Sequence, residues 1–275
     1  MKLTWIVLGL ALVASCARVE RLAIPPSEPL APVWGRFAEA PGPAPNHDDW
    51  DSFLARYHSV DQAGIARIDY AAVTDADRAL LGRYIEGLEA TDLTTLDRAQ
   101  ALAFWINAYN AATVAVVLDA YPVGSIREIT DGPLSIGPWD RKVMKVEGVP
   151  LSLNDIEHKI IRPFFDEHRI HYAVNCAAAG CPNLEPTAWR AEGLTERLAR
   201  AERAYVNDPR GVTIGPDGQI TVSKIYLWFE EDFGDGDAAV LESIARAAEP
   251  ELAAALAGRD GPDGYDYDWS LNSPR

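Results

Sequence analysis

The longest run with helical spacing in this 275-residue chain is DRAQALAFWINAYNAATVAVVLDAY, residues 97–121. Apolar residues occupy nearly every face of the helix that this run would form, and a helix of that kind is usually buried. The dipeptide Tyr121-Pro122 ends it, because proline cannot continue the ladder of backbone hydrogen bonds. The run therefore predicts a buried central helix with the rest of a domain packed around it.

Two amides interrupt this apolar run. Asn107 and Asn110 lie three residues apart, so they share one face of the predicted helix. A buried amide without a hydrogen-bond partner costs on the order of 1–3 kcal/mol, so both side chains need partners. In one interpretation they bind the backbone of a loop. In the other, one of them, such as Asn107, orients a catalytic group.

The flanking sequence predicts further helices and short hairpins. The fold class is α+β: a helix-rich single domain with a central buried helix and a small, mainly antiparallel sheet, for which a papain-like arrangement is one candidate. A capping box that starts at Asn154 predicts a helix carrying Glu157, His158 and Arg162. The other predicted elements are helices 49–57, 75–88, 187–206 and 238–256, hairpins 142–151 and 212–222, and an extended segment through Tyr265, Tyr267 and Trp269.

The composition excludes one class of partner. The net charge is −16 at pH 7, whereas binding to nucleic acid needs clustered lysines and arginines. We therefore expect no nucleic-acid partner. Phosphate-loop, nucleophile-elbow and HExxH motifs are absent from the sequence, and no cofactor is predicted.

The N-terminus has the pattern of a lipoprotein signal peptide. A short apolar run, residues 3–13, is followed by Val-Ala-Ser-Cys, which resembles a bacterial lipobox ending at Cys16. This pattern predicts a signal peptide over 1–15, lipidation of Cys16, and a membrane partner through that lipid anchor. The expected location is the bacterial cell envelope, at the outer membrane or its periplasmic face.

A Pro- and Ala-rich segment, residues 16–47, follows the predicted anchor. Such a composition favours extended geometry and predicts a tether, from which Trp34 and Phe37 could dock back onto the domain. The folded region is then 48–275.

Candidate reactive residues are concentrated in HRIHYAVNCAAAGCPNL, residues 168–184. Residues 170–175 read as a short buried strand, so Cys176 would lie at its end. Cys176 is a candidate nucleophile for a thiol hydrolase or transferase acting on a peptide or amide. In a regular strand His171 and Cys176 face opposite sides, which favours His158 as the base, oriented by Glu157 or Asn107.

Two other interpretations of the same stretch remain open. Cys176 and Cys181 could form a disulfide in an oxidising envelope compartment, which would make the protein a non-catalytic binding or scaffold domain. His168 and His171 with the two cysteines are four potential zinc ligands, but their spacing matches no usual zinc pattern, so no metal is predicted. The partner, whether peptide, cell wall or protein, is left undetermined by the sequence.

Four blocks of sequence together resemble a known family. They are FWINAYN at 104–110, LSLNDIEH at 151–158 with Arg162, IHYAVNC at 170–176 running to Cys181-Pro182, and SKIY at 223–226 with Trp228 before Asp232-Phe233. They are similar to the family called domain of unknown function 547, over about residues 49–233. The resemblance implies no activity. Its plant members, which are fused to coiled-coil segments, imply a scaffold role in plants.

Overall fold

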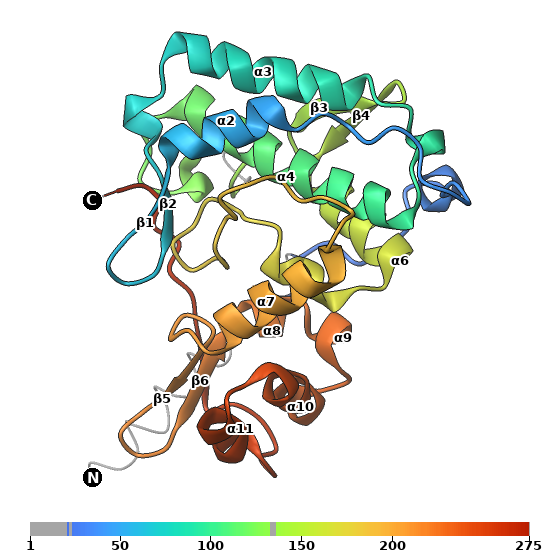
Figure 1. The fold of residues 1–275 in the computed structure, drawn as a ribbon. Coiled ribbons are helices and arrows are strands. Elements are labelled where there is room, and N and C mark those ends of the chain that lie inside the picture. Colours follow the sequence, from blue (N-terminus) through green and yellow to red (C-terminus); the bar gives the residue numbers. More distant parts are fainter. Residues whose placement is uncertain (1–20, 22–23, 133–135, 275) are drawn as a thin grey trace. The chain divides into compact units, whose positions relative to one another are not determined.

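The computed structural model describes the chain apart from residues 1–20, 22–23, 133–135 and 275. It has the predicted α+β fold, in which helices dominate and the short strands pair mainly antiparallel (Figure 1). The chain divides into two compact units. The larger contains Ser27–Ala201 and the chain from Asp268 on, and the smaller contains Glu202–Tyr267. The predicted signal peptide and Cys16 lie outside the described residues.

The larger unit contains a set of helices and two antiparallel hairpins. Its α-helices are α2 (Asp48–Tyr57), α3 (Asp75–Glu89), α4 (Arg98–Ala120), α5 (Leu153–Ile156), α6 (Arg162–Phe165) and α7 (Leu194–Val206), within which the unit boundary falls. Its 3-10 helices are η1 (Pro32–Gly35), η2 (Tyr70–Ala72), η3 (Leu93–Thr95), η4 (Ile126–Glu128) and η6 (His168–Tyr172), and η5 (Glu157–Ile161) is a π-helix. The hairpins are β1 (His58–Val60) with β2 (Ala66–Ile68), and β3 (Lys142–Val146) with β4 (Val149–Ser152).

The smaller unit combines a three-stranded sheet with short helices. Its strands β5 (Val212–Ile214) and β6 (Ile220–Ser223) pair antiparallel, and β7 (Gly264–Asp266) joins β6 in parallel. Its helices are α8 (Ile225–Trp228), α9 (Glu230–Phe233), α10 (Asp237–Ala247) and α11 (Pro250–Leu256). The predicted hairpin at 212–222 is confirmed.

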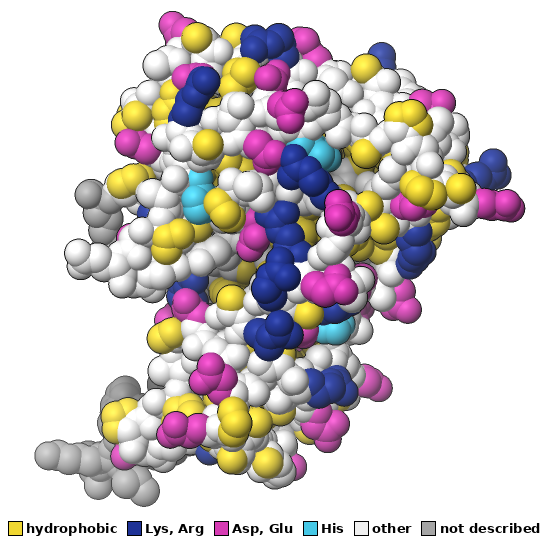
Figure 2. Space-filling model, in the orientation of Figure 1, with side chains coloured by type: hydrophobic (Ala, Val, Ile, Leu, Met, Phe, Trp, Pro, Cys, Tyr) yellow, Lys and Arg dark blue, Asp and Glu magenta, His cyan; other side chains and the backbone are white. Residues whose placement is uncertain are grey.

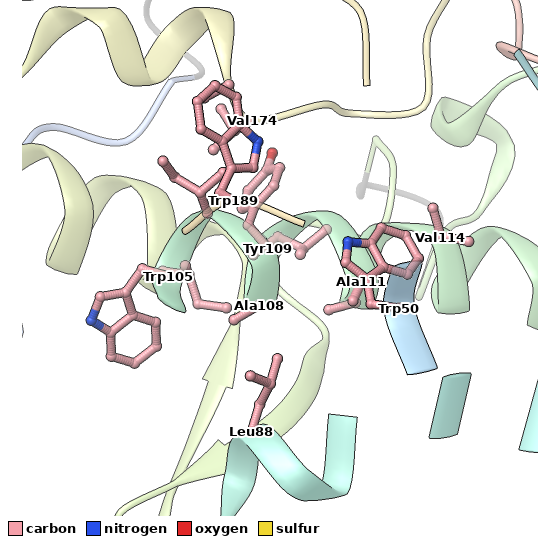
Figure 3. Packing of buried hydrophobic residues seen from close by; sticks show 14 of the residues in the cluster. Trp50, Leu88, Trp105, Ala108, Tyr109, Ala111, Val114, Val174 and Trp189 are labelled. Atoms are coloured by element: carbon pink, nitrogen blue, oxygen red, sulfur yellow. The ribbon is translucent and has the colours of Figure 1, made fainter. Parts of the chain in front are cut away.

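Helix α4 is the predicted central helix. Asp97 caps its N-terminus, and its side chain and that of Gln100 bind each other's backbone N–H groups in a capping box. The helix is long and apolar enough to cross a membrane, yet 94% of its most apolar window is buried inside the protein, as in the core helix of a soluble domain. Figure 3 shows side chains from other parts of the unit packed around α4, among them Trp50, Leu88 and Trp189.

The described part of the Pro-rich segment packs onto the larger unit. Trp34 is 5% exposed, and its ring meets Trp105 of α4 edge-on at 5.6 Å between centroids. Phe37 packs against Phe165, and Arg98 lies over both of these rings. The prediction that the two aromatic residues dock onto the domain is confirmed, and residues from Ser27 on are part of the folded unit.

A proline explains where this segment docks. Pro163 has no N–H, so it cannot donate to the carbonyl of Lys159, as in an α-helix, or of His158, as in a π-helix. Those two carbonyls accept hydrogen bonds from the N–H groups of Leu30 and Glu28, at 3.0 and 3.2 Å. The N-terminal segment therefore satisfies the backbone groups that Pro163 leaves open beside η5.

The predicted strand at 170–175 is wrong. Residues His168–Tyr172 form η6, in which the N–H of Ile170 donates to Glu167 and that of Ala173 donates to Ile170. Alternating β-branched and aromatic residues favour a strand only when a neighbouring strand can receive its hydrogen bonds. In this unit a side chain of α4 takes that role, as described below.

Three helix boundaries differ from the prediction. The helix predicted from residue 187 begins at Leu194, after Gly193 with a φ of +67°. The helix predicted over 238–256 is divided into α10 and α11, because Pro250 disfavours helical geometry at the preceding residue. The capping box near residue 154 is formed by Ser152 with Asp155, two positions before the predicted one.

Acidic side chains do not gather into one patch on the face seen in Figure 2. They are scattered over that face, whereas several Lys and Arg side chains lie next to one another near its middle. Such a mixed surface mainly promotes solubility.

Candidate functional site

Asn110 holds the segment that carries the candidate nucleophile. Its Nδ2 donates to the carbonyl of Ala173 at 2.9 Å, and its Oδ1 accepts from the N–H of Asn175 at 2.8 Å. Asn110 is 1% exposed. Its amide therefore supplies to the chain after η6 the donor and acceptor that a neighbouring strand would otherwise supply.

Asn107 does the same for another loop. Its Nδ2 donates to the carbonyl of Trp189 at 2.8 Å, and its Oδ1 accepts from the N–H of that residue at 2.9 Å. The interpretation in which both amides bind loop backbone is thus confirmed. The contacts of Asn107 direct its amide to Trp189, whereas Asn110 acts at the segment next to Cys176.

Helix η5 carries three buried ionisable side chains, Glu157, His158 and Arg162, the last at its C-terminal boundary. Nη1 of Arg162 lies 3.0 Å from Nδ1 of His158. A guanidinium group has only donors, so Nδ1 of His158 must accept. The proton of the neutral imidazole is then on Nε2, and His158 presents a donor rather than a lone pair on that side.

Glu157 faces a different histidine. Its Oε1 lies 3.8 Å from Nδ1 of His171, and the two side chains are 8% and 1% exposed. A buried carboxylate at this distance favours a proton on the facing nitrogen and stabilises the imidazolium form. At 3.8 Å the two groups are within ion-pair range, which is longer than the hydrogen bond between the acid and the histidine of a catalytic triad.

The hydroxyl of Tyr109 from α4 joins this group. Burial raises the pKa of Tyr109 well above its ordinary value, and the charges of Glu157, Cys176 and Cys181 raise it further, as does its hydrogen bond to Glu157. Tyr109 is 2% exposed, so its hydroxyl donates to the Glu157 carboxylate in a dry environment. The Glu157 carboxylate is thus a direct hydrogen-bond partner of this hydroxyl, and the two cysteines lie within electrostatic range of it. Glu157, His171, Cys176, Cys181 and Tyr109 are called the Tyr109 cluster below.

A second tyrosine, Tyr70 of η2, is within electrostatic range of the two cysteines. Burial raises the pKa of Tyr70, and the charges of Cys181 and Cys176 raise it further. Its hydroxyl donates to Oδ1 of Asn272 at 2.9 Å. Figure 3 shows Tyr109 on α4 together with Val174 and Trp189, the latter from the loop that Asn107 holds.

The cysteines lie on one short loop. Cys176 is partly exposed and Cys181 is 3% exposed, and both carry thiols rather than a disulfide in this structure. The N–H of Cys176 donates to Sγ of Cys181 at 3.1 Å. Ala177 follows with a φ of +59°, a left-handed conformation that is strained for a residue with a side chain and that is concentrated at functional sites.

The structure pairs several candidate residues in ways that the sequence did not predict: Glu157 with His171, and His158 with Arg162. His171 lies on η6, so the argument that a strand separates it from Cys176 no longer applies. Asn107 is directed to Trp189. In the described part of the chain no group of three or more His, Cys, Asp or Glu is placed to hold a metal ion.

Three residues around the candidate site were not recognised in the sequence. Tyr109, Tyr70 and Asn175 line or hold the site, and none was selected from the sequence. A signal existed for Tyr109, because it lies between Asn107 and Asn110 and carries a polar group into an otherwise apolar helix. Tyr70 had no such signal, since it is distant in sequence from every other member.

Comparison with known proteins agrees with the resemblance noted above. No curated protein and no solved structure matches the chain significantly. Residues 93–206, less than half of the chain, match the family model described as "Protein of unknown function, DUF547". The matched region contains every residue of the Tyr109 cluster and also His158 and Arg162. This match supports assignment of the chain to the DUF547 family, whose function is unknown.

Proposed function

We propose that this protein is a cysteine-dependent hydrolase or transferase that acts on a peptide or amide, with Cys176 as the nucleophile. The observation that carries the proposal is the Tyr109 cluster: the Tyr109 hydroxyl binds Glu157, the partner of His171, and lies within electrostatic range of the partly exposed Cys176. Perturbed titratable groups gathered around a potential nucleophile are typical of catalytic sites. The strained backbone at Ala177 is a second feature in favour.

His171 is the base in this proposal, in place of His158. The Nδ1 lone pair of His158 accepts from Arg162, so a proton added to this ring would place its positive charge next to that of the guanidinium. A proton on His171, by contrast, would lie beside the carboxylate of Glu157. Glu157 is the orienting residue, and the hydrogen bond from Tyr109 holds that carboxylate in place.

The chemical steps follow from these roles. His171 takes the proton of the Cys176 thiol, and the thiolate attacks the substrate carbonyl carbon. The tetrahedral intermediate collapses, the C–N bond breaks, and His171 returns its proton to the leaving amine. Water or an acceptor amine then attacks the resulting thioester, which gives hydrolysis or transfer and regenerates the thiol.

The first prediction concerns thiol reactivity. In the native, reduced protein we expect iodoacetamide to modify Cys176 about tenfold or more faster than Cys181, because Cys181 is buried and only Cys176 would be paired with a base. Peptide mapping of the carbamidomethylated protein, sampled over time, measures both rates. Replacing His171 with Asn should move the pH dependence of Cys176 labelling toward that of an ordinary thiol.

Two outcomes would contradict this proposal. Equal labelling rates at the two cysteines, or a pH profile unchanged by His171→Asn, would show that Cys176 is not an activated thiol. A Cys176–Cys181 disulfide that resists reduction in the native protein would favour the alternative, a binding or scaffold domain with that disulfide. His158→Asn is the matched control, since it replaces a buried histidine on η5 and should leave the labelling profile closer to that of the wild type.

We also propose that the protein is a bacterial envelope lipoprotein anchored through Cys16. Support comes from the sequence alone: a short apolar run and small residues before a cysteine. Metabolic labelling of expressing bacteria with a radioactive fatty acid should label the full-length protein and its Cys176→Ser variant, but not Cys16→Ser. Label retained by Cys16→Ser, or absent from the wild type, would overturn the lipid anchor.

A further inference from the structure

The loop between the two cysteines is closed by side-chain hydrogen bonds. Asn175 precedes Cys176, and its Nδ2 donates across the loop to the carbonyl of Pro182, which follows Cys181, at 2.8 Å. Its Oδ1 accepts from the N–H of Ala177 at 2.9 Å. Asn175 is 5% exposed, so water competes little for these bonds. One buried amide thus holds the two ends of the loop together.

Backbone hydrogen bonds also hold the interior of the loop. A turn from Ala178 to Cys181 reverses the chain, with an N–H···O bond of 3.1 Å between these residues. The chain near the C-terminus runs along the loop: Ala179 donates to Ser270 at 2.7 Å, and Asn272 donates to Ala177 at 2.9 Å. Because these bonds form without any link between the sulfurs, the loop is preorganised in the dithiol state.

We propose that Cys176 and Cys181 are a reversible dithiol–disulfide pair that exchanges with other disulfides, with Cys176 attacking and Cys181 resolving. Cys176 is the more exposed of the two, so an external disulfide reaches it first. Cys181 is buried, but its Sγ lies 3.1 Å from the backbone nitrogen of Cys176. A donor to sulfur favours the thiolate, which is the form that attacks a mixed disulfide.

The exchange is balanced with a disulfide RS–SR as the oxidant. The Cys176 thiolate attacks one sulfur, which forms a mixed disulfide and releases one RS⁻. The Cys181 thiolate then attacks Sγ of Cys176, the mixed S–S bond breaks, and the second RS⁻ leaves. The protein loses two electrons and two protons, and the oxidant becomes two RSH. Reduced thiols run the sequence backwards.

This inference shares Cys176 with the proposed function but does not require it. Oxidation would block the nucleophile reversibly, which adds a redox control to a thiol enzyme in an oxidising compartment. The exchange is measured by mass on the protein alone, without a substrate. A failed hydrolase assay with normal exchange, or the reverse, therefore separates the two proposals.

The test uses glutathione disulfide and intact mass. In the wild type, glutathione disulfide should give a transient adduct of one glutathione and then a protein lighter by the two thiol hydrogens. Cys181→Ser should stop at the glutathione adduct on Cys176, because no resolving thiol remains. Cys176→Ser should react slowly, because the remaining thiol is buried. Cys181→Ala repeats the test if the serine variant does not fold.

The two hydrogen bonds of the Asn175 amide at the ends of the loop, called the Asn175 clamp, provide a second readout. Asn175→Ala should lower the effective concentration of one thiol at the other about 5- to 30-fold. This concentration is measured as the equilibrium constant of disulfide formation in mixtures of reduced and oxidised glutathione. Asn183→Ala is the matched control. Its Nδ2 donates to the carbonyl of Gly64, and its Oδ1 accepts from the N–H of Ala66. It should leave the equilibrium within about twofold of the wild type.

Two results would overturn the proposal that Cys176 and Cys181 form a reversible dithiol–disulfide pair. The first is a wild-type protein that accumulates glutathione adducts without forming the internal disulfide. The second is equal shifts for Asn175→Ala and Asn183→Ala, which would show that the clamp does not position the cysteines.

Discussion

Replacing Asn110 with alanine is expected to lower the free energy of unfolding by roughly 2–5 kcal/mol. The variant loses both hydrogen bonds of the amide, to the carbonyl of Ala173 and from the N–H of Asn175. Each buried group left without a partner costs about 1–3 kcal/mol, and a small cavity adds to the loss. Urea unfolding at pH 7, followed by circular dichroism, measures the change.

The same substitution should also disturb the candidate site. Asn110 holds the segment directly before Cys176, so Asn110→Ala should slow the modification of Cys176 by iodoacetamide in the folded protein. Asn107→Ala removes equivalent bonds to Trp189 and should cost similar stability, but with a smaller effect on Cys176. Asn154→Ala, at an exposed contact with Asp140, should stay within about 0.5 kcal/mol of the wild type. A loss near that of Asn154→Ala would show that the Asn110 bonds do not hold the segment.

Acidification from pH 7 to pH 4 is expected to cost about 2–3 kcal/mol of stability through His47. This side chain is 7% exposed, and its Nδ1 lies 2.8 Å from the hydroxyl of Tyr84. Burial lowers the pKa of His47 to about 4, and the charge of Arg190 lowers it further. The folded protein therefore holds the ring neutral at pH values where an unfolded chain would protonate it.

The sign and the pH window follow from that difference. An exposed histidine has a pKa of about 6.5, so the unfolded state takes up a proton first as the pH falls. The stabilisation is complete above pH 6.5 and is lost progressively between about pH 6.5 and 4, at up to about 1.4 kcal/mol per unit. Burial also lowers the pKa of His58, so this residue acts in the same direction.

Urea unfolding at several pH values between 4 and 7 measures this dependence. His47→Gln should remove most of the slope in that window and leave the part due to His58 and, near pH 4, to Glu167, whose pKa, against the opposing effect of burial, is lowered by Arg169. Asp155, whose pKa is held down mainly by Lys142 and Lys159 against the opposing effect of burial, contributes only as the pH falls below the ordinary carboxyl range, so it does not confuse the result. An unchanged slope in His47→Gln would refute the assignment.

Local sequence was sufficient for the elements whose causes are local. The run at 97–121 predicts α4 because its apolar pattern, its Asp97 cap and its Tyr121-Pro122 end all act within a few residues. The hairpins β3–β4 and β5–β6 were predicted because their turn residues impose the reversal themselves. The α+β class follows from these elements.

The elements that were mispredicted depend on distant partners. Residues 170–175 have the composition of a strand, but their hydrogen bonds go to nearby carbonyls and to Asn110, more than 60 positions earlier in the chain. The Pro-rich segment reads as a tether, and its described part docks where Pro163 leaves two carbonyls open, which accept hydrogen bonds from Glu28 and Leu30. No local pattern contains this information.

From residue types and spacing, the sequence selected Cys176, Cys181, Glu157, His158 and His171 as candidates for reactive chemistry. Their pairing depends on the tertiary structure. It places Arg162 on Nδ1 of His158 and Glu157 beside His171, and it brings the hydroxyl of Tyr109 to the Glu157 carboxylate. The physical reason is that a side chain's protonation and orientation depend on contacts made through space, which residue types and spacing do not encode.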